Sequence, residues 1–546
     1  MRSLFLLAGV LIAGGSAAPA AENEGGAVET VVNPWVTTDK YVDTSSLEGI
    51  VAGIAREGMT DEGKVLAFYH WYRRMLFHHR FMGGDRRDVL KVLNSYGCNL
   101  CGSQAAVFVV MLQKAGFKTR VCAAKGGEGF GTHTFVQIFY DGKWHCFDTM
   151  TSFCVYNRAD PPRIASLDEL KADPTIVTMA VEEKRAPPGF VYCEGHQENT
   201  VKDIPKLKAS MGSRDFRWST CIFEGGTFTE FWAKAAKKGW TLTEGGTYNG
   251  RYTPGVTDFT LKPNEELVRL WDHISGKYVK KASHPDFGPH HTCGAADEHD
   301  PMHFKFYEPY LKENLGHTKK CYRYFGNGWL EWKPKTGAEV AAACKLRSLA
   351  REDVLFKVAG ASGTLTIPVK VPYAGVEIEL DLLLKQEGEG SVTRVYLVKR
   401  VGRNRKARRT EVAKIEGKFD GAKKIVVPHT DAGLFEYELA IEGKRADGGS
   451  VIFAPVRLRT IFQENIYALP GFFPGKNTVT VRAAKAQEIK QHALAVTYEW
   501  AEGEGWATPK SVTKKFETLP ASFEVEVAGP KMPRMKKLVV RLEPKP

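Results

Sequence analysis

The sequence has no apolar run long enough to cross a membrane. Its longest apolar stretch, Leu4–Ala13, is only about half of the roughly 20 residues that a membrane-spanning helix requires. A positive charge at Arg2 precedes this stretch and small residues follow it, which is the order of a secretory signal peptide. We therefore expect a signal peptide over residues 1–20, cleaved after Ala20, and a secreted or periplasmic protein without a transmembrane segment.

The sequence also lacks any motif typical of nucleic-acid binding. Its 76 Lys and Arg residues exceed its 63 Asp and Glu residues, which gives a formal charge of +13. The basic residues are spread along the chain, apart from a short cluster over Lys399–Arg409 that we expect to form a hairpin between strands. The surplus charge could favour anionic partners such as acidic glycans or cell-surface polymers. We expect no nucleic-acid partner and no cofactor.

Cysteine is too sparse for a small scaffold stapled by disulfides. An exported chain with ten cysteines is still expected to form some disulfides, but their pairing cannot be read from the sequence. If Cys101 is kept as a thiol, an odd number remains, so at least one further cysteine stays outside any permanent pair. The ten are Cys98, Cys101, Cys122, Cys146, Cys154, Cys193, Cys221, Cys293, Cys321 and Cys344.

The chain of 546 residues is too long for one hydrophobic core and suits about three domains. From Leu355 onward, short strands alternate with Gly, Asn and Asp turns, which is typical of a β-sandwich followed by further strands. The predicted boundaries are 1–20 for the signal peptide, 21–45 for a flexible lead-in, 46–200 for an α+β domain, 201–350 for an aromatic-rich and mostly β linking domain, 351–465 for a β-sandwich and 466–546 for additional strands.

The α+β domain is predicted from a change of pattern along the chain. Thr60 is a candidate cap for an amphipathic helix, and a short helix is expected over Arg86–Asn94. A third helix over Gly102–Lys114 is almost wholly apolar and is therefore expected to be buried on most sides. Strands follow, and the pair Asp141-Gly142 between two of them is a strong hairpin signal. Helices followed by an antiparallel sheet indicate an α+β arrangement.

Three residues of this domain could carry nucleophilic chemistry. Cys101 lies at the start of the buried helix, where the helix dipole stabilises a thiolate and the backbone N–H can point at a developing oxyanion. His133 begins one strand of the predicted hairpin and Asp148 lies on the other strand. The imidazole would pair with the thiolate and protonate the leaving nitrogen, while the carboxylate would fix the orientation of the ring.

The order and spacing of these residues resemble the motif of the transglutaminase-like superfamily. In that family the nucleophilic Cys is followed at its fourth position by Ala, then by a Leu-rich helix, a Gly and an Arg that enters the first strand. A His heads a later strand, and after a hairpin an Asp precedes a Thr. The matching residues are Cys101, Ala105, Gly116, Arg120, His133, Trp144, Asp148 and Thr149. The resemblance covers about residues 55–160 and implies a papain/transglutaminase-like fold with Cys101, His133 and Asp148 as catalytic residues.

The strand after His133 departs from the family pattern. The family commonly has Trp and Glu at the second and fourth positions after the His, where this chain has Phe135 and Gln137. Those positions shape the cleft and do not carry the nucleophile, so the chemistry stays possible while the substrate preference is open. No residue is assigned as a second oxyanion donor. The candidates are Trp71, Asn94, Ser95, Tyr96 and Gln104.

Two further patterns need their own interpretations. Cys98 and Cys101 form a C-x-x-C pair before a helix, which could be a redox dithiol, although no βαβ context precedes it. A disulfide between them could instead block the nucleophile. A cluster over His284–His303 offers ligands suited to zinc or copper, but its spacing fits no metal motif, so ordinary surface histidines are favoured and no metal is predicted.

The sequence therefore predicts a secreted cysteine enzyme that forms an acyl-thioester at Cys101. Water would then give a protease, amidase or deamidase activity, whereas a lysine amine would give a crosslink. Hydrolysis is slightly favoured, since related bacterial domains include peptidases and nothing indicates a calcium-regulated crosslinker. We expect a protein or peptide substrate associated with the cell envelope or a glycan. The rival interpretation is a noncatalytic extracellular binding or structural protein that uses the same fold as a scaffold.

Overall fold

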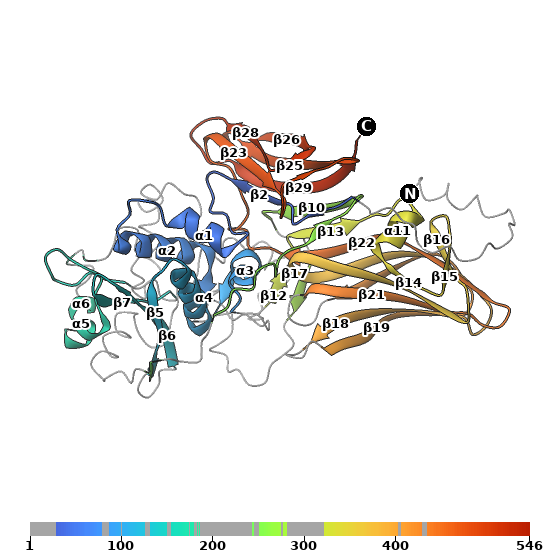
Figure 1. Ribbon diagram of the computed structural model, residues 1–546, viewed down its shortest axis with the longest axis horizontal. Helices are drawn as coiled ribbons and strands as arrows, with labels where there is room; N and C mark the ends of the chain where they lie inside the picture. The colour runs from blue at the N-terminus through green and yellow to red at the C-terminus, as the bar shows by residue number, and fades with distance from the viewer. Residues whose placement is uncertain are drawn as a thin grey trace.

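The computed structural model shows the helices α1 to α6 gathered at one end of the molecule and the long strands at the other, with α11 (Gly337–Ala343) beside the strands (Figure 1). The described residues are 29–78, 87–99, 101–125, 132–149, 154–173, 175–178, 183, 185, 243–244, 250–272, 274, 277–280, 322–401, 406–428 and 434–545. The predicted signal peptide with its cleavage site, much of the predicted linking domain and the histidine cluster over 284–303 lie outside these residues.

The helices of the N-terminal domain begin close to where the sequence predicts them. Thr60 caps α2 because its hydroxyl accepts a hydrogen bond from the Gly63 N–H at 3.1 Å, which satisfies one of the donors left over at a helix start. The expected short helix is divided between α3 and a π-helix, η1, which ends at Gly97 with a φ of +63°. The helices are α1 (Leu47–Ile54), α2 (Asp61–Met75), α3 (Val89–Lys91), η1 (Val92–Tyr96), α4 (Cys101–Lys114), α5 (Leu167–Ala172) and α6 (Thr175–Thr178).

An antiparallel sheet of four strands, in the order β7-β6-β5-β8, follows these helices. Asp141 and Gly142 have φ values of +46° and +84° and join β6 to β7, which confirms the predicted hairpin. The strands are β5 (Lys118–Lys125), β6 (Thr132–Tyr140), β7 (Lys143–Phe147) and β8 (Thr243–Glu244).

Helix α4 packs against β5 and β6 through its apolar residues. Phe108 and Met111 are fully buried and share a core with Val136 and Ile138 of β6. Because side chains alternate across a strand, α4 covers the face of β6 that carries its even-numbered positions. Burial against the sheet and against neighbouring helices explains the nearly continuous apolar sequence of α4.

The rest of the described chain is dominated by long strands (Figure 1). Fourteen strands form one connected sheet. They are β10 (Glu265–Leu270), β13 (Gly328–Trp332), β14 (Lys345–Arg347), β15 (Leu349–Glu352), β16 (Leu355–Val358), β17 (Ser362–Glu387), β18 (Val392–Val401), β19 (Lys406–Glu416), β20 (Phe419–Pro428), β21 (Leu434–Lys444), β22 (Ser450–Gln463), β25 (His492–Glu502), β26 (Thr508–Phe516) and β29 (Arg534–Pro544). The antiparallel pairing of β18 with β19 confirms the hairpin predicted around the basic cluster.

Strand β17 pairs with different strands along its 26 residues. Its first part, Ser362–Lys370, pairs with β21, whereas its last part lies between β20 and β22. The register shifts after Lys370, where the change of partners occurs. Leu365 from the first part and Leu380 from the last part are fully buried in the same core. This one strand therefore links two sets of strands around a shared core.

The region predicted as a flexible lead-in, residues 21–45, contains two strands in its described part. Strand β1 (Val31–Val32) pairs with β9 (Thr260–Leu261), and β2 (Trp35–Thr38) pairs with β23 (Gly475–Arg482), beside which it lies in Figure 1. The strands are held because Val31 and Val36 are buried in the core of the C-terminal strands. The prediction of a flexible segment rested on the Gly and Ala residues that precede these strands in the sequence.

The remaining elements are short helices and strands, and these strands belong to small sheets. They are β3 (Phe77–His78), β4 (Cys98–Asn99), β11 (Tyr278–Lys280), β12 (Tyr322–Phe325), α11 (Gly337–Ala343), β24 (Gln487–Glu488), η3 (Glu504–Trp506), β27 (Thr518–Leu519) and β28 (Ala521–Val527). Within the described part of the chain, every helix is too short or too polar to span a bilayer.

Candidate active site

Cys101 is the first residue of α4 and is partly exposed. The first N–H groups of a helix have no partners within the helix, and the positive end of the helix dipole lies beside them. This position is the basis of the expectation that Cys101 reacts as a thiolate. Among the described residues, Cys101, Cys122, Cys146, Cys154 and Cys344 carry thiols that are not joined in disulfides.

The chain direction brings the start of α4 to the end of the sheet that carries the other two predicted residues. Only residues 115–117 connect α4 to β5, so the helix runs back along the strand that it covers. The 14 residues of α4 span about 21 Å and the eight residues of β5 about 26 Å, so Cys101 lies near the level at which β5 ends. Because β5, β6 and β7 are antiparallel, β6 begins and β7 ends at this same level.

The register of the sheet relates His133 to Asp148. His133 lies opposite Ala124 of β5, and Val136 lies opposite Phe147 of β7. Continuing this register by one residue sets Asp148 opposite Phe135, so positions 133 and 148 are diagonal neighbours on one face. Such neighbours have Cα atoms about 7–8 Å apart. The side chain of His133 lies outside the described residues, and the catalytic triad stays a prediction.

Helix α4 covers the opposite face of the sheet from positions 133 and 148. Its core contacts are with the even-numbered positions of β6, such as Val136 and Ile138. A sulfur at the start of α4 would therefore meet an imidazole from His133 around the end of the sheet and not across its face. This arrangement suits Cys101 because the residue is the first of its helix and is partly exposed.

Two tyrosines of α2 hold the main chain around the candidate residues. The Tyr69 hydroxyl donates to the Asp148 carbonyl at 3.0 Å, and the Tyr72 hydroxyl donates to the Gln104 carbonyl in the first turn of α4 at 2.8 Å. The sequence predicts the amphipathic helix that carries both tyrosines but does not reveal this role. The one available signal was the choice of Tyr at two positions that face a core, because a buried Tyr hydroxyl usually needs a partner.

Asp148 is fully buried and lies near the Cys146 thiol. Burial raises the pKa of Cys146 well above its usual value, and the nearby Cys122, Asp148 and Cys154 raise it further. Cys146 therefore stays a neutral thiol at any physiological pH. A charged thiolate beside Asp148 is therefore disfavoured.

The departure from the family motif at Gln137 is accommodated by a local contact. The Arg120 Nε donates to the Gln137 Oε1 at 2.6 Å, and the guanidinium lies 4.3 Å from the centre of the Trp144 ring. A neutral amide thus stands where the family commonly has Glu, and it accepts a hydrogen bond from the Arg that enters the first strand. Arg120, Gln137 and Trp144 form a polar platform on the same face of the sheet as positions 133 and 148.

The candidates for a second oxyanion donor make structural contacts. The Asn94 Nδ2 donates to the Thr44 carbonyl at 2.8 Å, and the Gln104 Nε2 donates to the Asn99 carbonyl at 3.0 Å. Ser95 and Tyr96 face the β-rich region: the Ser95 hydroxyl donates to the carbonyl of Gln463 and the Tyr96 ring meets the Phe435 ring edge-on. Trp71 is half-buried against the helical core. None of these contacts identifies a second donor.

The described residues contain no group of three or more His, Cys, Asp and Glu side chains that could hold a metal ion. The histidine cluster over 284–303 lies outside them, as does the side chain of Cys98. The blocking disulfide is not formed in this structure, because Cys101 carries a thiol. The redox and metal alternatives stay as the sequence leaves them.

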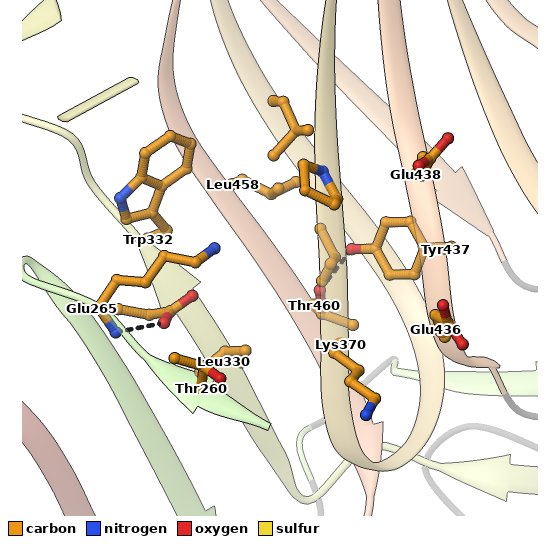
Figure 2. Close-up of a pocket in the computed structure, with 14 residues that line it drawn as sticks. Thr260, Glu265, Leu330, Trp332, Lys370, Glu436, Tyr437, Glu438, Leu458 and Thr460 are labelled. Atoms are coloured by element: carbon orange, nitrogen blue, oxygen red, sulfur yellow. Dashed lines mark hydrogen bonds between the residues drawn. The ribbon is translucent and has the colours of Figure 1, made fainter. Parts of the chain in front are cut away.

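A second candidate site is a pocket of about 240 Å³ in the β-rich region (Figure 2). Glu265 and Trp332 lie on one side of the pocket, and Tyr437 and Thr460 lie on the other. The Glu265 carboxylate accepts a hydrogen bond from the Lys262 N–H at 2.9 Å, and burial raises the pKa of this carboxyl group. The Tyr437 and Thr460 hydroxyls lie 2.6 Å apart. The pocket thus combines aromatic surface with hydroxyl and carboxyl groups.

Comparison with known proteins gives one family match. Residues 48–149 match the family model described as the transglutaminase-like superfamily. No curated protein matches the chain.

Solved structures give only weak similarities. The N-terminal CBM22 tandem domain of Paenibacillus barcinonensis Xyn10C has 9% sequence identity, with 38% of this chain and 87% of that chain covered and a TM-score of 0.19. Red sea bream transglutaminase has 10% identity, with 89% of this chain and 69% of that chain covered and a TM-score of 0.14. Scores this low do not establish a shared fold.

Proposed function

Because residues 48–149 form a domain of the transglutaminase-like superfamily, we propose that the protein is a cysteine enzyme that attacks carboxamide or peptide bonds. Cys101 would be the nucleophile, His133 the acid and base, and Asp148 the residue that orients the imidazole. The observation that supports this proposal is the shared end of the sheet, at which α4 and β6 begin and β7 ends. A cysteine, a histidine and a carboxylate occur at those three chain positions.

The proposed reaction proceeds through a thioester. The Cys101 thiolate adds to the substrate carbonyl carbon, and the oxyanion is stabilised by N–H groups at the start of α4. The imidazolium of His133 protonates the leaving nitrogen as the C–N bond breaks, which releases ammonia or an amine and leaves an acyl group on the sulfur. Neutral His133 then takes a proton from water as the water attacks the thioester, which gives a carboxylic acid and restores the thiol.

Hydrolysis is the preferred second step, and a lysine amine in place of water would give a crosslink by the same route. Both outcomes follow from which nucleophile reaches the acyl-enzyme. We place the enzyme outside the cytoplasm, in accord with the predicted signal peptide, and expect its substrate to be a protein or peptide of the cell envelope. The change of partners along β17 supports a C-terminal β-sandwich, which would present the N-terminal domain to that surface.

The test uses selective alkylation of the full-length protein with iodoacetamide at pH 6, followed by peptide mapping. Cys344 is a control within the chain because it is also partly exposed, while burial raises its pKa to about 12. We expect Cys101 to react much faster than Cys344, since a thiolate reacts and a thiol does not. The His133→Ala variant should lose the selective reaction, because the imidazole no longer stabilises the thiolate.

Activity provides the second readout. Release of ammonia or new amines from a peptide library should disappear in Cys101→Ser and fall by about 100-fold or more in His133→Ala, because general acid–base catalysis contributes about 10²–10⁴-fold. Thermal melting of both variants serves as the folding control. Equal, slow labelling of Cys101 and Cys344 in the wild-type protein would rule out the proposed enzyme.

Noncatalytic binding is the second candidate function, and the pocket in the β-rich region favours it. The pocket is lined by the Trp332 and Tyr437 rings and the Thr460 hydroxyl group, together with charged side chains. The charged residues are Lys262, Glu265, Lys370, Glu436 and Glu438. This combination suits a small polar ligand such as the end of a glycan chain. Isothermal titration calorimetry with neutral oligosaccharides should then show binding to the wild-type protein. Loss of the hydroxyl group in Thr460→Val should weaken it by up to about tenfold. Absence of binding to the wild-type protein would reject this function.

A further inference from the structure

A three-residue strap, Gln463–Asn465, joins the β-rich region to the segment that leads into Cys101. The strap begins at the last residue of β22, whereas η1 and Gly97 come shortly before Cys101 in the sequence. About 370 residues separate the two segments along the chain, as the Gln463 contacts with Ser95 and Tyr96 show. The contact is therefore made by folding and has no local origin.

The strap supplies the caps that the end of η1 lacks. The last carbonyl groups of a helix have no partners within the helix and must find them elsewhere. The Asn465 side chain donates to the Leu93 carbonyl at 2.7 Å, and the Asn465 N–H donates to the Asn94 carbonyl at 2.8 Å. The Gln463 side chain donates to the next two carbonyls, those of Ser95 and Tyr96, both at 3.1 Å. Four consecutive carbonyl groups are thus satisfied by two residues of the strap.

The same strap also caps the end of α2. The Asn465 side chain donates to the carbonyl of Met75, the last residue of α2, at 2.9 Å. The residues after these two helices, Phe77–His78 and Cys98–Asn99, pair as the parallel strands β3 and β4. Asn465 therefore fixes the starting points of both strands, and Cys101 follows two residues after β4.

The other face of the strap is anchored in the β-rich region. In an extended segment successive side chains point to opposite sides, and Glu464 accordingly points away from Gln463 and Asn465. Its two carboxylate oxygens accept from the Arg269 Nε–H of β10 at 3.1 and 2.9 Å, and one of them also accepts from the Arg269 Nη2. Both groups are buried. The Asn327 side chain also holds the backbone N–H and C=O of Glu464, at 2.7 and 2.9 Å. The strap is thus fastened on both sides.

The fit around Gly97 leaves little room for movement. A Cβ atom at Gly97 would lie 3.0 Å from the Asn465 Cγ, and the φ of +63° favours glycine. The Ser95 hydroxyl adds two more contacts, since it donates to the Gln463 carbonyl at 2.7 Å and accepts from the Ala374 N–H at 2.6 Å. The segment before Cys101 is therefore held against the strap on several sides.

We propose that Gln463 and Asn465 are positioning residues for Cys101. They fix the loop that sets where α4 begins, and thereby the position of the Cys101 sulfur relative to His133. The β-rich region is then a structural part of the active site and not only an appended module. This inference rests on the proposed function of Cys101 as the nucleophile.

The test compares two buried asparagines in the full-length protein. Asn465→Ala removes the side-chain contacts of the strap to the Met75 and Leu93 carbonyls and leaves its backbone contact to Asn94 in place. Asn477→Ala is its matched control. The Asn477 side chain also donates to backbone carbonyls, those of Phe473 and Gly475, but it lies within the C-terminal strands. The rate of Cys101 alkylation by iodoacetamide is measured against pH, and the melting temperature is measured for each variant.

The expected result separates positioning from stability. Both variants should melt at lower temperatures, but only Asn465→Ala should slow Cys101 alkylation at pH 6, by about tenfold to 100-fold, because displacement of a catalytic group by about 1 Å can cost that much. Its alkylation should also need a higher pH. Wild-type reactivity in Asn465→Ala would overturn the positioning role alone, whereas an unreactive wild-type Cys101 would overturn the proposed function and this inference together.

A milder pair of variants covers the case in which Asn465→Ala does not fold. Gln463→Ala removes only the contacts to Ser95 and Tyr96, and Ser95→Ala removes only the hydroxyl that meets Gln463 and Ala374. Each should slow Cys101 alkylation less than Asn465→Ala would and should leave Cys344 unchanged. If both variants are folded and keep the wild-type rate, the positioning role is wrong.

Discussion

The N-terminal domain and the β-rich region use their buried polar groups differently. In the N-terminal domain, neutral side chains bind the backbone near Cys101: Tyr69 and Tyr72 from α2, and Gln104 from α4 itself. In the β-rich region, charged side chains bind one another across strands, as Glu331 does with Arg459 at 2.6 Å. Neutral contacts to the backbone fix positions, whereas ion pairs join strands. The β-rich region also has neutral side chains that bind the backbone, as Asn477 does, so its buried ion pairs across strands are what distinguish it from the surroundings of Cys101.

The two regions also contain different numbers of thiols. Of the five thiols in the described part of the chain, Cys101, Cys122, Cys146 and Cys154 belong to the N-terminal domain and its continuation, and Cys344 belongs to the β-rich region. Burial keeps Cys146 and Cys344 protonated by raising their pKa values. Among these five thiols, nucleophilic sulfur is therefore expected at Cys101, where a helix start is partly exposed.

The largest expected effects come from removing one buried ring from each region. Phe108 and Phe453 are both fully buried, the first beside the Tyr69 and Tyr72 rings and the second in the core around β17. Phe108→Ala and Phe453→Ala should each lower the free energy of unfolding by about 3–5 kcal/mol. Only Phe108→Ala should also slow Cys101 alkylation, because both tyrosines lose packing. Urea denaturation and alkylation rates measure the two effects, and equal slowing in both variants would break the comparison.

A somewhat smaller effect tests whether the buried ion pair between Glu464 and Arg269 anchors the strap to the β-rich region. Glu464→Gln keeps the shape of the side chain but leaves the buried Arg269 charge without its carboxylate, which should cost about 3 kcal/mol of unfolding free energy. Glu411→Gln is the control, since its pair with Arg394 is partly exposed and should contribute below about 1 kcal/mol. Denaturation curves for both variants measure the difference. If Glu464→Gln is as stable as Glu411→Gln, the strap is not anchored as described.

Local elements of the fold could be predicted from the sequence because their signals are local. The Thr60 cap, the apolar helix α4 and the Asp141-Gly142 turn each depend on a few adjacent residues. The pairing of β2 with β23 could not be predicted, because it joins Trp35 to Arg482 and is selected by burial in a distant core. The change of partners along β17 is hidden for the same reason, since one alternating sequence serves both parts.

At the candidate site, too, local features could be predicted from the sequence and long-range contacts could not. The order of Cys101, His133 and Asp148 predicted a helix that begins at the cysteine and a hairpin that carries the other two residues. The structure has α4 and the β6–β7 hairpin in this order, and the catalytic triad stays a prediction. The sequence could not show that Tyr69 hydrogen-bonds to the Asp148 carbonyl, because a backbone carbonyl leaves no signature in the residue type. The strap was equally hidden, since Asn465 caps helices that are distant in the sequence.

A smaller effect concerns the acid sensitivity of the β-rich region. Burial would raise the pKa of Glu331, but hydrogen bonds from Lys333 and Arg459 outweigh it and hold the pKa below its ordinary value of 4.5. Because the folded value is the lower one, this stabilisation is complete above about pH 4.5 and is lost as the pH falls through the folded pKa. Glu331→Gln should therefore be less stable than the wild type at pH 6 and should approach it at low pH, as measured by urea denaturation.

The control for this pH series is Glu524→Gln. Glu524 pairs with Lys476, but both side chains are more than half exposed, so solvent screens the pair. Its stability should follow the wild-type pH curve. If Glu331→Gln also follows that curve, the buried ion pairs do not distinguish the β-rich region, and the comparison loses its electrostatic half.

The smallest expected effect sharpens the comparison with two helix caps of the same kind. The Thr60 hydroxyl accepts from the Gly63 N–H at the start of α2, and the Thr336 hydroxyl accepts from the Glu339 N–H at the start of α11. Thr60→Ala and Thr336→Ala should each cost about 1 kcal/mol of stability, measured by urea denaturation. Helix α2 carries the tyrosines that hold the candidate site, so fraying at its start should slow Cys101 alkylation slightly, whereas fraying of α11 should leave the rate unchanged. A slower rate in Thr336→Ala would show that stability anywhere in the chain controls the nucleophile, and the two regions would then be one cooperative unit.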